Sequence, residues 1–173
     1  DFDAVRSAAR SAWEQALSAI TVKGGNTDDL KNFYTAMYHS MVVPNVVSDI
    51  NGEYRRHNME IGQLPKGKVQ YSTFSLWDTF RAWNPLMTLI DTTLVNNMIN
   101  SFLDESSGEL PIWPLSAGET GTMIGYHAVS VIADAYMKGI RGFDAEKALE
   151  AMVVSSEKNK KGADYYIQNG FIP

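Results

Sequence analysis

The stretch MIGYHAVSVIADAYM, residues 123–137, contains no Lys, Arg or Glu, and its only acidic residue is Asp134. A helix that is apolar on nearly all sides must be buried on nearly all sides. We therefore predict that an inner helix begins at Thr120 or Thr122 and ends near Lys138. Such a helix requires other helices packed around it.

Two further segments, residues 3–20 and 144–157, are predicted to form helices with one apolar stripe and a charged opposite face. One-faced outer helices around all-round apolar inner helices are typical of a double-layered helical toroid, although a large bundle gives the same pattern. The number of predicted helices is about half of that in an (α/α)6 toroid. We therefore predict an all-α fold, in which residues 1–173 form a single helical domain that is part of a larger toroid.

Residues 44–72, between a predicted helix that starts at Thr27 and the helical pattern that returns at Phe74, have a different character. The pair Asn51-Gly52 is typical of a tight turn and predicts a small β-hairpin. The stretch 55–70 contains scattered Gly and Pro and predicts one long irregular loop. Loops of that length in a compact domain are usually functional or disordered.

The composition, 45% hydrophobic and 20% charged with a net charge of −5, is that of a globular protein rather than a disordered tail. The densest basic cluster, Lys158, Lys160 and Lys161, closes a predicted helix, so we expect no nucleic-acid partner. Apolar runs stay well below the roughly 20 residues of a membrane span. The chain has no cysteine, which excludes thiolate catalysis and Cys-bound zinc and suits an exported bacterial protein.

The segment YSTFSLWDTFR, residues 71–81, closely resembles the signature of glycoside hydrolase family 92. Further stretches agree with the family in the same order along the chain. They are residues 33–36 with 38–40, 52–55, 110–111 with 113, 118–120, 123–128, and 134–136 with 138–139. The resemblance extends from about residue 33 to the end of the chain, and several ordered matches make it specific.

The resemblance implies a bacterial, calcium-dependent, exo-acting α-mannosidase with an N-terminal β-sandwich and a C-terminal toroid of six helical hairpins. It also implies that hydrolysis inverts the anomeric configuration of the sugar. In this mechanism a carboxylic acid protonates the leaving oxygen and a carboxylate activates water. In the family pattern the acid, the aspartate base and the calcium ligands lie in motifs C-terminal to this segment, and nothing here resembles those motifs. We therefore expect no catalytic residue and no metal ligand in the chain, and no activity in isolation.

The resemblance also implies where the protein acts and what it binds. We expect a mannose-containing glycan as its ligand and a periplasmic or secreted location, with the export signal in a part that precedes Asp1. A different reading is a non-catalytic helical module that binds glycans or a partner protein. A module of that kind would bind a sugar by itself, whereas part of an enzyme would not do so detectably.

Four residues are predicted to contact substrate: Trp77, Asp78, Arg81 and Glu119. An aromatic ring packs on the apolar face of a sugar, and a carboxylate accepts hydrogen bonds from two adjacent hydroxyls. The residues alone leave a structural reading open, with Trp77 in the core and Asp78 paired with Arg81. Glu119 precedes a predicted helix, where unpaired backbone amides explain a carboxylate equally well.

Two further expectations concern His127 and the surface of the chain. His127 has no His or carboxylate three or four residues away, so we interpret it as a core histidine rather than a metal ligand.

The inner helices of half a toroid leave apolar flanks without partners. We therefore expect either a homodimer through that face or terminal segments that fold over it.

Overall fold

The computed structural model describes residues 1–56, 58–105, 108–116, 118–158 and 162–172. The chain divides into two compact units, Asp1–Val43 and Pro44–Pro173. The single helical domain predicted from the sequence stays a prediction. Each unit contains helices, and the three short ribbons of strands belong to the second unit.

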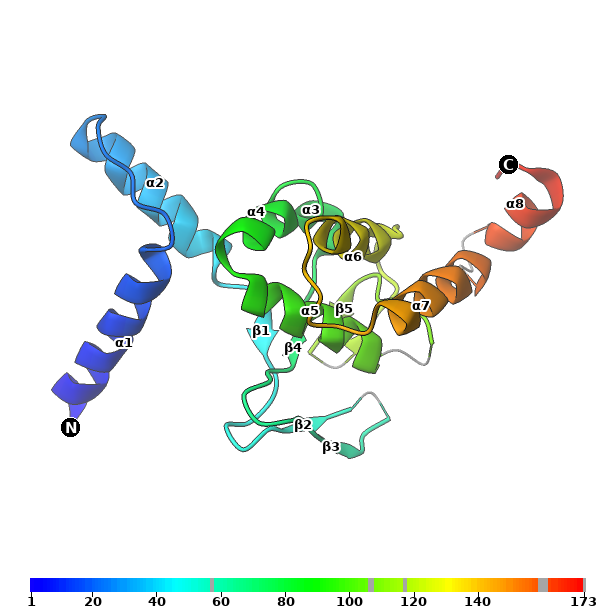
Figure 1. Ribbon diagram of the computed structural model, residues 1–173, viewed down its shortest axis with the longest axis horizontal. Coiled ribbons are helices and arrows are strands. Elements are labelled where there is room, and N and C mark those ends of the chain that lie inside the picture. The colour runs from blue at the N-terminus through cyan, green and yellow to red at the C-terminus, as the bar shows by residue number, and fades with distance from the viewer. Residues whose placement is uncertain (57, 106–107, 117, 159–161, 173) are drawn as a thin grey trace. The chain divides into compact units, whose positions relative to one another are not determined.

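The described chain is mostly helical, which confirms the predicted all-α class (Figure 1). The helices are α1 (Phe2–Leu17), α2 (Thr27–Ser40), α3 (Leu76–Thr79), α4 (Trp83–Ile90), α5 (Thr92–Glu105), α6 (His127–Met137), α7 (Ala145–Lys158) and α8 (Ala163–Asn169). The antiparallel strand pairs are β1 (Asn45–Val46) with β4 (Tyr71–Ser72), β2 (Glu53–Arg55) with β3 (Ile61–Gln63), and β5 (Pro114–Leu115) with β6 (Gly118–Glu119). None of the described helices combines the length and the apolar character that a membrane crossing requires.

In the first unit, α1 and α2 contact each other through aromatic side chains. The ring centroids of Trp13 and Tyr38 are 4.7 Å apart. The side chain of Asp1 accepts a hydrogen bond from the Ala4 amide (2.8 Å), so Asp1 caps the helix and Asp3 lies in its first turn. A negative charge in the first turn also stabilises a helix. The helix predicted over 3–20 is therefore present, although none of its residues is buried.

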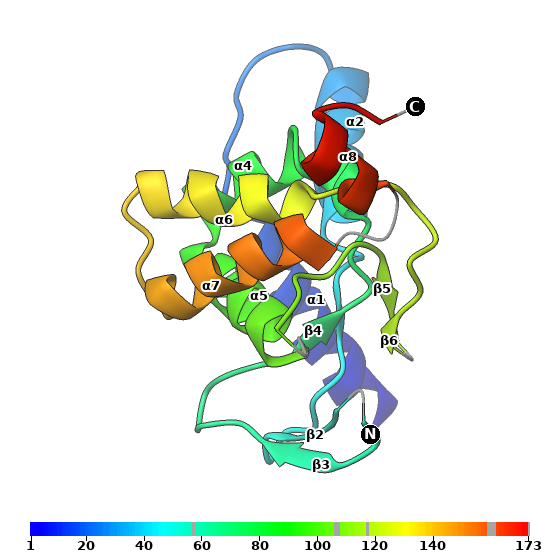
Figure 2. The same ribbon diagram turned by 90° about the vertical axis from the view of Figure 1, so that its right-hand side faces the viewer.

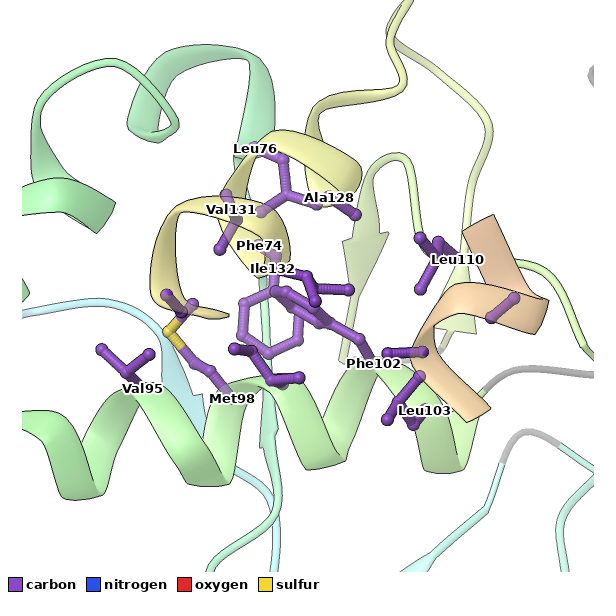
Figure 3. Close-up of a cluster of buried hydrophobic side chains, with 14 of the residues drawn as sticks. Phe74, Leu76, Val95, Met98, Phe102, Leu103, Leu110, Ala128, Val131 and Ile132 are labelled. Atoms are coloured by element: carbon purple, nitrogen blue, oxygen red, sulfur yellow. The ribbon is translucent and has the colours of Figure 1, made fainter. Parts of the chain in front are cut away.

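The core of the second unit forms where α5 packs against α6 and α7. Phe102 on α5 is fully buried and meets Phe74 edge to face, with ring centroids 4.7 Å apart. Figure 3 shows these rings between α5 and α6, in one cluster with Met98 and Ile132. Full burial of a large apolar side chain contributes about 1.5–3 kcal/mol, so this cluster is the main source of stability in the unit.

The predicted inner helix is wrong in its start, and its burial in a longer protein stays a prediction. The helix α6 begins at His127, because Gly121 and Gly125 have φ of 59° and 151°, which no α-helix allows. Within this chain one face of α6 is open, since Tyr136 is 42% and Met137 is 82% exposed. The adjacent helix α5 buries more of its length than α6 does.

The helix α7 matches the predicted helix over 144–157 in extent. Asp144 caps it, because its carboxylate accepts a hydrogen bond from the Lys147 amide (3.0 Å). The buried face consists of small residues such as Ala148 and Ala151, whereas Leu149 is 61% exposed. Figure 2 shows α7 lying along α6 and α5. Self-association through the exposed apolar side chains stays a prediction.

The pair Asn51-Gly52 forms the predicted tight turn. The Gly52 amide donates to the Asp49 carbonyl (2.9 Å), and Gly52 has φ of 87°. The stretch 55–70, predicted to be one irregular loop, instead contains β3, which pairs with β2 in a second hairpin. This hairpin extends away from the helices of its unit (Figure 1).

Tyr54 ties that hairpin to the C-terminal end of α5. Its side chain is buried, and its hydroxyl donates a hydrogen bond to the Asp104 carboxylate. The Arg56 Nε donates in turn to the Tyr54 oxygen (3.3 Å). Burial, followed by the hydrogen bond to Asp104, raises the pKa of Tyr54 above its ordinary value, so the phenol remains a donor at neutral pH.

Candidate functional site

The signature segment, residues 71–81, runs from β4 through a bend into α3. Thr73 has φ of 68°, a left-handed conformation that is rare for a β-branched residue. Phe74 and Leu76 are buried, and the Phe74 amide donates to the Pro114 carbonyl (3.1 Å). These contacts hold the bend in place, and backbone strain of this kind is concentrated at functional sites.

Trp77 and Asp78 follow the buried Leu76 on α3 and are both exposed. Trp77 is 40% exposed and therefore lies outside the core of this chain. None of the ion pairs of the described residues joins Asp78 to Arg81, and the Arg81 guanidinium lies over the Phe80 ring, 5.2 Å from its centroid. The segment therefore presents an indole, a carboxylate and a guanidinium at its surface.

His127, at the first position of α6, contacts two aromatic rings of the signature segment. Its ring centroid lies 5.4 Å from that of Trp77, with 79° between the planes, and 4.4 Å from that of Phe80. The sequence did not predict this contact, because His127 lies 50 residues from Trp77 along the chain. The only sequence signal was that both residues fall within stretches that resemble the same family.

Glu119 organises the β5–β6 hairpin. Its carboxylate accepts hydrogen bonds from the backbone amides of Ile112 (2.7 Å), Trp113 (3.0 Å) and Gly121 (2.7 Å). The sequence placed Glu119 just ahead of a helix, but α6 begins eight residues later. The amides that stabilise its charge therefore belong to the hairpin and not to a helix terminus.

The hairpin is joined to the signature segment through backbone contacts. The Ser72 hydroxyl donates to the Leu115 carbonyl (3.1 Å), next to the bond between Phe74 and Pro114. In the described part of the chain, no hydrogen bond or ion pair links Glu119 to Trp77, Asp78 or Arg81. The structure thus brings Trp77 and His127 into contact, and places Glu119 on a neighbouring loop.

Replacement of Glu119 by alanine is expected to lower the free energy of unfolding by about 1–2 kcal/mol. The variant loses three charge-assisted hydrogen bonds, but water can solvate the exposed amides in their place. Urea denaturation followed by circular dichroism measures the change. Glu119→Gln is the matched control and retains part of the stability, because its side-chain carbonyl still accepts. A Glu119→Ala variant within about 0.5 kcal/mol of the parent would contradict the role of the carboxylate in the hairpin.

The described residues contain no cluster of acidic side chains that would mark a calcium site. Calcium takes about six to eight oxygen ligands, mostly carboxylates and carbonyls. Across the described ranges, no three His, Cys, Asp or Glu side chains gather closely enough to hold a metal ion. We therefore assign no metal-dependent step to these residues, and the expectation that the calcium ligands lie elsewhere stays a prediction.

The surface around α3 is suited to a polyhydroxylated ligand. An indole face packs on the C–H groups of a sugar ring, a carboxylate accepts hydroxyl hydrogen bonds, and a guanidinium donates them. Trp77, Asp78 and Arg81 provide these three groups within five residues. The helical fold and this set of side chains define a candidate carbohydrate-binding domain.

Comparison with known proteins identifies the family. The model of the glycosyl hydrolase family 92 catalytic domain matches residues 1–173. The chain therefore belongs to glycosyl hydrolase family 92, which confirms the resemblance seen in the sequence.

The chain is similar to solved structures over its whole length. It superposes on the family GH92 alpha-mannosidase BT3965 from Bacteroides thetaiotaomicron with a TM-score of 0.92 at 35% identity, covering 100% of this chain and 24% of that one. The inverting mannosidase BT2199 of the same organism gives a TM-score of 0.91 at 31% identity, covering 100% of this chain and 25% of that one. An uncharacterised secreted glycosidase from Arthroderma benhamiae is 31% identical over 162 residues, which are 91% of this chain and 16% of that protein. The chain thus spans about a quarter or less of these relatives.

Proposed function

We propose that the chain is part of the helical catalytic domain of an exo-acting, inverting α-mannosidase that removes terminal α-linked mannose from glycans. The observation that carries this proposal is the exposed Trp77–Asp78 pair on α3, within the segment that resembles the family signature. The similarity to family GH92 mannosidases, one of them solved in complex with mannoimidazole, supports it. In the proposed fold, the helices form about half of an (α/α)6 toroid.

In the proposed site, the indole of Trp77 packs against the terminal mannose while Asp78 accepts hydrogen bonds from two of its hydroxyls. Arg81, held over the Phe80 ring, donates to the same sugar. Glu119 acts on the substrate mainly by shaping the hairpin that carries Trp113, because three backbone amides already occupy its carboxylate.

The catalytic acid, the catalytic base and the calcium ligands are proposed to lie outside these 173 residues. An inverting glycosidase needs two carboxyl groups about 6.5–9.5 Å apart, with room for a water molecule between the base and the sugar. Among the described residues, we assign no second carboxyl group that would act together with Asp78. The sequence contains no stretch that resembles the family's catalytic motifs. A periplasmic or secreted location is proposed with it, supported by the secreted fungal relative and the absence of cysteine.

The proposal predicts that the longer enzyme hydrolyses an activated aryl α-mannoside with calcium present, and that chelation abolishes turnover. Proton NMR of the first product should show β-mannose, because inversion changes the anomeric configuration. The 173-residue chain alone should show no turnover above the blank. Calcium-dependent turnover by the chain alone would show that the catalytic residues are misplaced in this proposal.

Two other results would contradict the enzymatic role itself. Lack of α-mannosidase activity in the longer, folded protein would do so directly. Tight mannoside binding by the chain alone, measured by calorimetry, would instead favour a non-catalytic binding module.

A further inference from the structure

We infer that His127 is a positioning residue, which holds the indole of Trp77 in the orientation that sugar contact requires. The inference rests on the proposed function of Trp77 and concerns how that side chain is held. Trp77 belongs to a helix of only four residues, and the N-cap residue Ser75 makes no side-chain capping bond. A single turn of helix has little stability by itself. The orientation of Trp77 must therefore come from contacts outside α3.

His127 supplies such a contact from α6. The ring planes of Trp77 and His127 are 79° apart at a centroid distance of 5.4 Å, which is an edge-to-face pair. The imidazole also contacts the Phe80 ring, with 4.4 Å between the ring centroids. His127 thus lies between a ring of α3 and a ring just after α3, while a large part of Trp77 stays exposed.

The backbone just before His127 leaves room for the imidazole ring beside Trp77 and Phe80. Gly125 has φ of 151°, and a Cβ at this position would lie 2.4 Å from His127 Nδ1, closer than any real contact. Glycine is therefore required for the imidazole to occupy its place. The intervening Tyr126 donates a hydrogen bond from its hydroxyl to the Met152 carbonyl on α7, which fixes the start of α6 from the opposite side.

The arrangement makes a specific prediction about the ring of His127. If the ring acts through Trp77, its shape matters and its nitrogen atoms do not. His127→Leu, which fills similar space without an aromatic ring, should lower kcat/KM for an α-mannoside roughly five- to tenfold, mainly through a higher KM. His127→Phe keeps a ring and should stay within about threefold of the parent.

A double-mutant cycle in the longer enzyme decides whether the effect passes through Trp77. The effect of His127→Leu should largely disappear when it is introduced into Trp77→Ala, because the side chain that it positions is gone. Thermal unfolding of every variant checks that the fold is kept. Ser130→Ala, at an exposed position on the same helix, is the control and should match the parent.

Three results would overturn the inference. Unchanged kinetics in His127→Leu would show that no positioning is needed. Equal losses in His127→Phe and His127→Leu, or a full loss in the Trp77→Ala background, would show that the imidazole acts by its own chemistry. Unchanged kinetics in Trp77→Ala alone would show that Trp77 does not contact the sugar. In that case the proposed site fails, whereas the other results concern only the role of His127.

Discussion

Replacement of Asp78 by alanine in the longer enzyme is expected to lower kcat/KM for an α-mannoside at least tenfold. A tenfold loss corresponds to about 1.4 kcal/mol, and a hydrogen bond to a charged group contributes about 1.5–3 kcal/mol. Asp78 is exposed and forms no ion pair with Arg81, so its carboxylate is available to a ligand. Steady-state kinetics with an activated aryl α-mannoside measure the loss.

The control for this variant is Glu150→Ala, which removes an exposed carboxylate from α7 and should leave the kinetics unchanged. Asp78→Asn should fall between the parent and Asp78→Ala, since the amide keeps one acceptor. Kinetics of Asp78→Ala equal to those of the parent would make Asp78 an ordinary surface residue, and the proposed contact with mannose would be wrong.

Replacement of Phe102 by alanine is expected to lower the free energy of unfolding by about 3–5 kcal/mol, the usual range for a buried phenylalanine. Phe102 is fully buried and packs edge to face on Phe74, which lies two residues before α3. The cavity should therefore loosen the signature segment as well as the core. The midpoint of urea denaturation measures the change.

Leu149→Ala is the matched control for the core, because Leu149 is a large apolar residue of α7 that remains mostly exposed. It should change the free energy of unfolding by no more than about 0.5 kcal/mol. If Phe102→Ala costs less than 1 kcal/mol, or no more than Leu149→Ala, the cluster around Phe102 is not the stabilising core.

Helical periodicity located most helices of this chain but could not tell how far each is buried within it. The apolar pattern of residues 123–137 is real, yet Gly121 and Gly125 delay the start of α6 until His127. Composition also cannot tell which neighbours cover a helix, so α6 was expected to be enclosed and is open on one face. Tyr54 shows the same limit for the hairpin, because its anchor, Asp104, lies 50 residues away in the sequence.

The sequence allowed members of the candidate site to be proposed but not their contacts. The signature segment pointed to Trp77 and Asp78, whose role in binding stays a prediction, and the structure places both at the surface of the chain, with Trp77 in contact with His127. The hydrogen bonds of Glu119 could not be predicted, since they depend on the fold of a loop with no periodic pattern. The ring contact between His127 and Trp77 could not be predicted because the two residues lie far apart in the sequence.

We propose that Trp77 and Asp78 bind the terminal mannose of a substrate. A crystal structure of the longer enzyme with mannoimidazole bound tests it most directly. We predict that both carboxylate oxygens of Asp78 lie within about 2.5–3.0 Å of sugar hydroxyls, as in O–H···O hydrogen bonds, and that the Trp77 ring packs beside the sugar. An inhibitor bound elsewhere, with Trp77 and Asp78 both facing solvent, would contradict the claim.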